Sequence, residues 1–211
     1  MLGIIDYGMG NIFSIKNAAK NIGLNSKIVS NPDEIINCSA LILPGVGAFG
    51  HAINKLNEDS LIDPIREFIN TGKYILGICL GMQLLVEKSY EFDENKGIGV
   101  LEAECKMFPR FVNDKKLIIP HTMWNQVKII NSSGKYPRIF ENIPDNSPFY
   151  FVHSFYVNKR IKSEVIGQTD YYDLEFCSAF QKENTIGVQF HPEKSGKFGL
   201  QLLTNFKNMI S

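Results

Sequence analysis

The chain has 211 residues, of which 44% are hydrophobic, so it can bury one substantial core and we expect a single domain over residues 1–211. Lysine plus arginine and aspartate plus glutamate number 22 each, which argues against a nucleic-acid or anionic-membrane partner. No apolar run approaches the roughly 20 residues that span a bilayer, and no basic leader segment is recognisable, so we expect a cytoplasmic protein.

The first half of the sequence alternates short apolar runs with helical patterns, which is typical of βα units and a mostly parallel sheet. We expect strands at Leu2–Asp6, Lys27–Val29, Ala40–Leu43 and Tyr74–Ile78. We expect a first helix from Ile12 to Ile22, which Gly23 ends, and a second that begins at Asn31–Pro32. Two further helices are expected around Leu61–Asn70 and over Met82–Glu87.

From about Glu102 onward the pattern changes to period-two, aromatic-rich strands separated by Asn, Gly and Pro turns. Examples are Val127–Ile130, Phe149–His153 and Cys177–Gln181. Thr185–Gln189 is expected to be a last buried strand, and apolar residues from Leu200 to Ile210 indicate a closing helix. The predicted class is therefore α/β, with an additional mixed or antiparallel portion in the second half.

The four cysteines lie far apart and form no metal-ligand spacing with histidine, so we expect no metal, no cofactor and no disulfide framework. Cys79 differs from the other three because it lies within Gly77–Gly81, a G-x-C-x-G segment between a predicted strand and a predicted helix. This is the thiol counterpart of the G-x-S-x-G nucleophile elbow, which exposes a nucleophile above a sheet edge. A buried packing cysteine remains the alternative, and it is what we expect of Cys38, Cys105 and Cys177.

A nucleophilic cysteine needs a base, and His191 follows the last predicted strand, where side chains project from the carboxyl edge of the sheet. His191 can accept the thiol proton and return it to a leaving amine. Glu193, held across Pro192, can orient the imidazole and stabilise its charge. By itself His191–Glu193 is more often a surface turn, but together with Cys79 it predicts a catalytic triad.

The segment Pro44–Gly47 ends another predicted strand at the same edge. Its glycines leave the backbone unhindered, so its N–H groups can point at a developing oxyanion. An ordinary βα turn explains the segment equally well.

These segments together resemble the class I (triad) glutamine amidotransferases, and among them the glutaminase subunits of imidazole glycerol phosphate synthases. The resemblance covers nearly the whole chain in order. The matching stretches are Ile5–Asn11, Leu43–Gly47, Gly77–Leu85, Tyr150–Phe155 and Gly187–Ser195. Anthranilate synthase glutaminases differ in their opening run and in the residues after the elbow.

The resemblance implies a flavodoxin-like open sheet and glutamine as the substrate. Cys79 is expected to attack the side-chain amide carbon, His191 to protonate the departing ammonia, and water to cleave the glutamyl thioester. The oxyanion and glutamine-binding residues implied are Gly45, Val46, Gly47, Leu80, Gln83, Glu91, Ser154 and Phe155. Ser154 and Phe155 are expected to act mainly through backbone groups, and His153 to be structural.

The resemblance also implies a heterodimer in which a separate (β/α)₈ barrel cyclase receives the ammonia for histidine biosynthesis. The positions implied at or near that interface are Asn11, Trp124, Asn125 and Lys194. His51 and His121 have no partner that the sequence identifies, so we expect solvated or hydrogen-bonded side chains rather than ligands.

One departure concerns the partner surface. Where the family usually reads Pro-His-Met-Gly-Trp-Asn, this chain reads Pro120–Asn125 with Met123 in place of glycine. Drift with compensating packing explains the change, since methionine fills irregular gaps. A reshaped docking surface is the alternative, as in paralogues that supply ammonia to amidinate a surface sugar. A thiol hydrolase or peptidase on a related elbow fold, and a regulatory subunit without turnover, are further alternatives.

Overall fold

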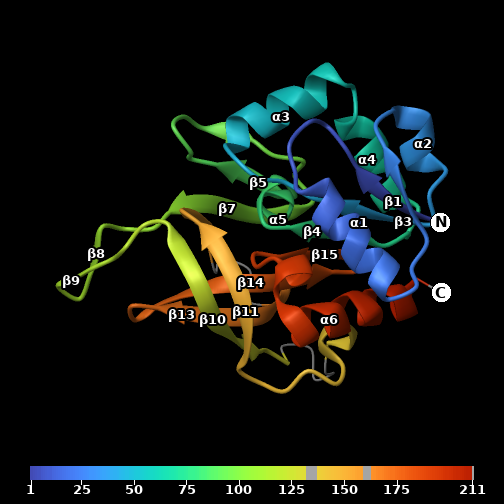
Figure 1. Cartoon of the computed structure of the whole chain (residues 1–211). Helices are drawn as coiled ribbons and strands as arrows, with labels where there is room; N and C mark the ends of the chain where they lie inside the picture. The colour runs from blue at the N-terminus through green and yellow to red at the C-terminus, as the bar shows by residue number, and fades with distance from the viewer. Residues whose placement is uncertain (132–136, 159–162, 211) are drawn as a thin grey trace.

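The computed structural model describes residues 1–131, 137–158 and 163–210. A large mixed sheet runs through it in the order β2-β1-β3-β4-β15-β14-β12-β7-β5-β6 (Figure 1). The strands at its parallel end are β1 (Leu2–Ile5), β2 (Ser26–Val29), β3 (Ala40–Leu43), β4 (Ile75–Ile78) and β15 (Thr185–Val188). This confirms the predicted α/β class with an open, mostly parallel sheet.

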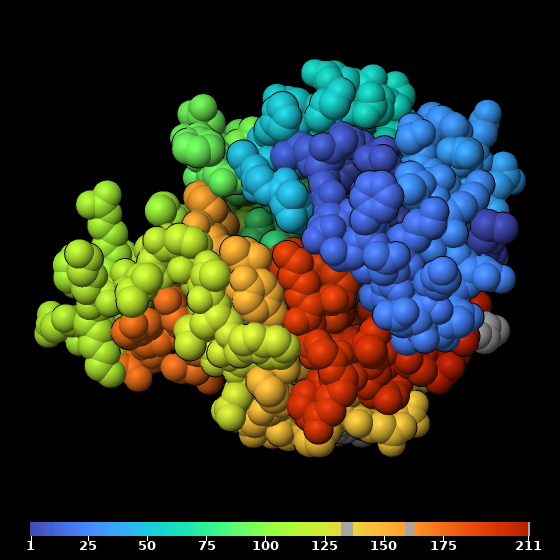
Figure 2. Space-filling model, viewed as in Figure 1, coloured from blue at the N-terminus to red at the C-terminus, as the bar shows by residue number. Residues whose placement is uncertain are grey.

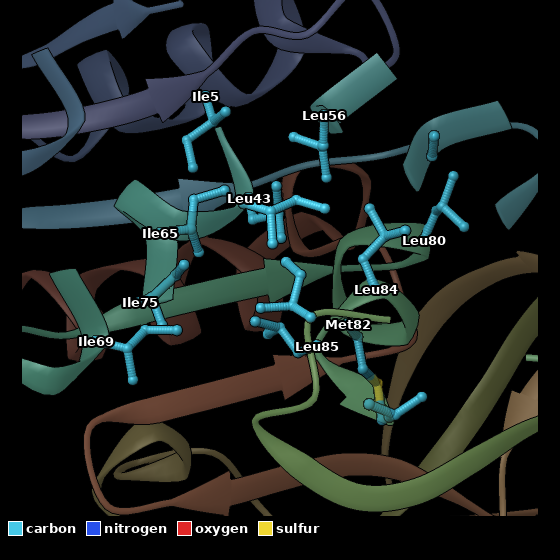
Figure 3. Packing of buried hydrophobic residues seen from close by; sticks show 14 of the residues in the cluster. Ile5, Leu43, Leu56, Ile65, Ile69, Ile75, Leu80, Met82, Leu84 and Leu85 are labelled. Carbon is cyan, nitrogen blue, oxygen red and sulfur yellow. The ribbon is translucent and has the colours of Figure 1, made fainter. Parts of the chain in front are cut away.

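Helices cover both faces of the parallel strands, because alternate strand residues are apolar on each side. The helices are α1 (Ile12–Asn21), α2 (Pro32–Ile36), α3 (Phe49–Glu58), α4 (Ile62–Asn70), α5 (Leu80–Leu84) and α6 (Gly196–Met209). Ile5, Leu43 and Ile75 pack with Leu56 of α3 and Ile65 of α4 on one face (Figure 3). The opposite face packs against α1 and α6.

The remaining strands form the predicted mixed or antiparallel portion. Its strands are β5 (Val86–Ser89), β6 (Asn95–Lys96), β7 (Leu101–Met107), β8 (Phe111–Val112), β9 (Lys115–Lys116), β10 (His121–Ile129), β11 (Ser147–His153), β12 (Phe155–Val157), β13 (Val165–Tyr171) and β14 (Leu174–Lys182). β10 pairs with β11 and β13, and β14 joins this portion to β15. The 3₁₀ turn η1 (Arg138–Phe140) precedes β11, and the 3₁₀ turn η2 (Pro192–Lys194) follows β15.

The prediction of a helix over Met82–Glu87 is confirmed for Met82–Leu84 and wrong for the residues after it. The helix α5 ends at Leu84, and Val86–Ser89 forms the strand β5. The carbonyls that would continue the helix accept hydrogen bonds from a distant segment instead: Ile98 N donates to Leu84 O at 2.8 Å and Gly97 N donates to Glu87 O at 2.7 Å. Tertiary hydrogen bonds thus override a local helical pattern.

The helix α3 was not predicted, although Phe49, Ala52, Ile53 and Leu56 are buried at helical spacing. No capping side chain from its own N-cap residue, Ala48, marks its start. The N–H of Phe49 donates instead to the carboxylate of Glu91, far along the chain. Among the residues described, no helix is both long and apolar enough to cross a bilayer.

We predict that α6 contributes much of the stability of the face it covers. Phe206 is completely buried there, so Phe206→Ala should lower the free energy of unfolding by about 3–5 kcal/mol through lost burial and a residual cavity. Asn208 is exposed on the same helix, and Asn208→Ala should change it by less than about 0.5 kcal/mol. Urea unfolding measures both, and similar values for the two variants would contradict the packing described.

Candidate active site

Three neighbouring strands place the predicted catalytic segments at one edge of the sheet. β4 lies between β3 and β15 and is parallel to both. Ile78 is in register with Val188, so Cys79 leaves β4 at nearly the level at which the chain leaves β15 toward His191. Pro44–Gly47 leaves β3 on the other side of Cys79. The carboxyl edge is where ligands bind in open α/β sheets.

The backbone of Cys79 adopts φ 56° and ψ −112°, which is strained for a residue with a Cβ. The flanking Gly77 and Gly81 do not make the turn through backbone freedom of their own, because neither has a positive φ. They permit close packing instead: a Cβ on Gly81 would lie 1.8 Å from Leu43 O, and one on Gly77 would lie 2.8 Å from Gly81 O. This packing holds Cys79 in its strained conformation at the tip of the elbow.

His191 and Glu193 form a buried pair. His191 Nδ1 lies 2.8 Å from Glu193 Oε1, and the two side chains are 3% and 1% exposed. Burial opposes a charge on the imidazole, but the interactions with Cys79 and Glu193 outweigh it and raise the pKa of His191 to about 10. His191 Nε2 makes no hydrogen bond to any residue in the described part of the chain. This nitrogen is therefore available to exchange a proton at the cavity.

A cavity of about 300 Å³ adjoins Cys79 and His191. It brings together most of the predicted oxyanion and substrate residues: Val46, Gly47, Leu80, Gln83, Glu91, Ser154 and Phe155. Pro120, Val152 and His153 complete the lining. No sequence pattern indicated this role for Pro120 or Val152, and His153 was expected to be structural. A cavity of this size accommodates one small amino acid, which fits a substrate with a short polar side chain.

Gly45 is the predicted oxyanion residue that does not line the cavity. A Cβ at this position would lie 2.7 Å from the hydroxyl of Tyr7 and 2.9 Å from Leu80 Cβ. Gly45 therefore permits the β3 turn to pack against the elbow helix. The wall of the cavity itself is formed by Val46 and by Gly47, which has a φ of +99°.

Several groups predicted to bind glutamine also bind the protein itself. Gln83 Nε2 donates to Phe155 O and to Gln189 Oε1, both at 2.9 Å. The Glu91 carboxylate accepts from Phe49 N at the start of α3. Phe108 N donates to Ser154 O at 3.0 Å. These bonds hold the cavity wall in place around Cys79.

Two buried polar residues near the cavity make contacts that the sequence did not indicate. Gln189 is completely buried, and its Nε2 lies 3.8 Å from Cys79 Sγ. His121, for which the sequence identified no particular partner, is hydrogen-bonded as one of the two expectations had it: it is completely buried, with its Nδ1 2.9 Å from His153 Nε2. Burial lowers the pKa of His121 to about 4, so this imidazole is neutral. No local pattern indicates either contact, because the partners lie 32 or more residues apart.

The residues predicted for the partner interface lie just before α1, on β10 and on η2. Trp124 is 50% exposed and packs edge-on against Tyr150, and the ammonium group of Lys194 lies 6.0 Å from the centre of the same ring. Asn11 is partly exposed and caps α1 by accepting from Ser14 N. Figure 2 shows the C-terminal segment, in red, between the blue N-terminal elements and the yellow-green and orange strands on one face.

This exposed cluster is directly connected to the catalytic segment. Tyr150 O accepts from His191 N at 2.9 Å, and Tyr150 N donates to Ser195 Oγ at 3.0 Å. Asn125 is only partly exposed, and its side-chain amide donates to Asp170 O at 2.9 Å. The four predicted interface residues are therefore available at the surface to different degrees, with Trp124 and Lys194 the most exposed.

Comparison with known proteins identifies the family. The family model for glutamine amidotransferase class-I matches residues 3–209. The chain belongs to this family. As an amidotransferase of class I it is a glutamine-using enzyme, and a Cys-His-Glu triad of the kind described is typical of the class. The prediction of the family from the sequence motifs is thereby confirmed.

The amidotransferase is also similar to individual relatives over nearly its whole length. It is 41% identical to imidazole glycerol phosphate synthase subunit HisH of Moorella thermoacetica, covering 99% of this chain and 95% of the relative. It is 44% identical to the subunit HisH of Aquifex aeolicus, covering 97% and 94%. The solved structure of PurLQS from Thermotoga maritima matches with a TM-score of 0.76 at 19% identity, covering 100% and 98% of the two chains, which supports the fold.

The strained elbow predicts an unusual order of stability among variants. Glycine adopts the backbone conformation of Cys79 without steric cost. The free energy of unfolding of Cys79→Gly should therefore be about 1 kcal/mol higher than that of Cys79→Ala. At Ala18, in the interior of the helix α1, Ala18→Gly should instead destabilise the amidotransferase by about 0.5–1 kcal/mol. Denaturant unfolding compares the variants. A Cys79→Ala variant as stable as Cys79→Gly would show that the elbow is unstrained.

The buried histidines predict sensitivity to acid. Burial lowers the pKa of His121 to about 4 and, with His121 beside it, that of His153 to about 3, whereas the unfolded imidazoles titrate near 6.5. At a pH between the folded and the unfolded pKa values, the unfolded chain binds protons at these imidazoles that the native state does not bind. Stability present above pH 6.5 is therefore lost as the pH falls toward 4, by up to about 2.7 kcal/mol per pH unit for two protons.

Urea unfolding at pH 7, 6 and 5 measures this dependence. His121→Phe should reduce the slope between pH 6 and 5 by at least about 1 kcal/mol per pH unit, because one excluded proton is removed. An unchanged stability of the wild type over this range would contradict the assignment of neutral, buried imidazoles.

Proposed function

We propose that this chain is the glutaminase subunit of an imidazole glycerol phosphate synthase, and that residues 1–211 form one glutamine amidotransferase domain. The observation that carries the proposal is the meeting of Cys79, His191 and the predicted glutamine-binding residues around one cavity of about 300 Å³. The similarity to HisH subunits, at 41–44% identity over nearly the full chain, supports the choice of subunit. A cytoplasmic location remains a prediction.

In the proposed reaction, Cys79 Sγ attacks the side-chain amide carbon of glutamine after its proton passes to His191. The tetrahedral oxyanion is stabilised by backbone N–H groups of the Val46–Gly47 segment and of Leu80. His191 then protonates the nitrogen, ammonia leaves and a glutamyl thioester remains. His191 next takes a proton from water, which attacks the thioester to release glutamate and regenerate the thiol. Glu193 holds Nδ1 of His191 throughout.

Gln83, Glu91 and the Ser154–Phe155 backbone are proposed to hold the amino-acid end of glutamine. Glu91 can pair with the ammonium group of the substrate, since its side chain lines the cavity. Its bond to Phe49 N also joins this carboxylate to the start of α3, just after the Gly47 turn. Binding of the ammonium group can thereby influence the oxyanion segment.

Ammonia at neutral pH is mostly protonated and non-nucleophilic, so it must reach its acceptor without entering bulk water. We propose that a (β/α)₈ cyclase subunit docks over Asn11, Trp124, Asn125 and Lys194 and receives it in histidine biosynthesis. The exposed Trp124 and Lys194, which adjoin Tyr150 and the His191 segment, support this location. Aromatic and cationic side chains of this kind are enriched at protein interfaces.

Met123 is the reason to consider a second kind of partner that would accept the ammonia. It is 46% exposed, next to Trp124 on β10, where the family usually has glycine. A cyclase-like partner that amidinates a surface sugar would meet this altered face. Met123 pairs across the strands with Phe151, so ordinary packing also explains it, and the HisH relatives favour the histidine pathway.

The chemistry is tested by the nucleophile. Cys79→Ala should abolish glutamate formation from glutamine, by at least a factor of about 10³, since no thioester can form. Circular dichroism and partner binding should remain as in the wild type, because the side chain is small. A coupled glutamate dehydrogenase assay measures turnover, and retained ammonia release by the variant would refute the mechanism.

The partner is tested by reconstitution. With its cyclase and the ribonucleotide acceptor bound, the wild-type subunit should turn over glutamine at least about tenfold faster than alone, as expected for a coupled heterodimer. Trp124→Ala should weaken the complex by at least about tenfold, whereas Phe92→Ala, at an exposed residue outside the proposed interface, should not. Stimulation by a sugar-amidinating partner but not by the histidine cyclase would reassign the pathway.

A further inference from the structure

A chain of buried hydrogen bonds connects β10 to the nucleophile. Asn125 Nδ2 lies 3.2 Å from His121 Nε2, and His121 Nδ1 lies 2.9 Å from His153 Nε2. His153 Nδ1 lies 2.7 Å from Phe155 O. Gln83 Nε2 donates to the same carbonyl and to Gln189 Oε1. The last member, Gln189 Nε2, lies 3.8 Å from Cys79 Sγ.

The direction of each bond in the histidine arm follows from chemistry. The Phe155 carbonyl can only accept, so His153 Nδ1 carries the proton. Burial keeps the pKa of His153 far below neutrality, so its Nε2 is unprotonated and accepts from His121 Nδ1. His121 Nε2 is left to accept from the Asn125 amide. Each imidazole therefore has one donor and one acceptor role, and neither ring can flip without breaking bonds.

The glutamine arm is equally determined. Gln83 Nε2 uses both of its hydrogens, one for Phe155 O and one for Gln189 Oε1. This orientation turns the Gln189 amide nitrogen toward the Cys79 sulfur. The sulfur therefore lies between this donor and Val152 O, at 3.9 Å. A donor at this position stabilises negative charge on the sulfur and fixes its rotamer.

We propose that Gln189 and the His121–His153 pair are positioning residues for the glutaminase reaction. The two arms converge on the Phe155 carbonyl and fix its position, and that of the Cys79 sulfur, relative to Asn125 on β10. The proposal rests on the proposed function, because it assigns these residues to a reaction at Cys79. Phe155 and Gln83 are members of the predicted glutamine-binding set, and they line the cavity with His153, whereas His121 and Gln189 do not. The chain therefore joins substrate binding to the nucleophile partly through groups outside the cavity.

The surroundings of His121 allow the chain to be cut with little change in packing. The His121 ring lies between Phe151, with centroids 4.9 Å apart, and Tyr171, at 4.1 Å. His121→Phe keeps an aromatic ring there and removes both polar contacts. His121→Gln keeps one donor and one acceptor. Tyr171→Phe is a matched control, since it removes a buried hydroxyl that donates to Ile118 O, outside the chain.

The test uses mass spectrometry to measure the rate at which a diazoketone analogue of glutamine labels Cys79 in the full-length subunit. His121→Phe and Gln189→Leu should each slow labelling at least fivefold, with His121→Gln and Tyr171→Phe within twofold of the wild type. The double variant His121→Phe/Gln189→Leu should be no more than twofold slower than the slower single variant, because both changes break one chain. Equal melting temperatures of His121→Phe and Tyr171→Phe would exclude general loosening.

Three outcomes would overturn the proposal: His121→Phe labels as fast as Tyr171→Phe, His121→Gln fails to restore the rate, or the two single effects multiply in the double variant. If the wild type is labelled normally in those cases, the proposed glutaminase function stands and only the positioning chain falls. Failure of the analogue to label wild-type Cys79 at all would overturn the proposed function, and the positioning chain with it.

Discussion

The close approach of the elbow to the neighbouring strand is the constraint on which the candidate site depends. Gly81 lies so near Leu43 O that no side chain fits between them. This contact and the parallel register of β3, β4 and β15 together hold the backbone of Cys79 in its strained conformation. A strained residue persists only where its surroundings over-determine it, and here the core on both faces of the sheet provides that rigidity.

The electrostatics of the site follow from the same packing. Because the His191 and Glu193 side chains are almost completely buried, their interaction is not screened by solvent, and together with Cys79 it favours the charged imidazole. The His121–His153 pair is buried as well but has no carboxylate partner, so burial is the dominant effect and lowers the pKa values of both histidines. Buried histidines thus take opposite charge states within one region of the protein, according to whether a carboxylate lies beside them.

These two environments suit different roles. A charged imidazole beside a cysteine favours proton exchange with a substrate, whereas a neutral, hydrogen-bonded pair favours fixed geometry. The backbone of Tyr150 links the segment of His191 to the exposed cluster of Trp124 and Lys194. The candidate site is therefore connected to the proposed docking face by short hydrogen-bonded and aromatic contacts.

The sequence by itself determined the α/β class, most strand positions, the family and the triad candidates, because strand periodicity and the elbow and His-Pro-Glu motifs are local patterns. Only the tertiary structure decided where α5 ends, since the carbonyls of Leu84 and Glu87 are taken by residues 97 and 98. It also decided the start of α3, which is capped by Glu91, and the contacts of Gln189 and His121. These depend on groups distant in the chain, and no local propensity encodes which distant group will supply a hydrogen bond.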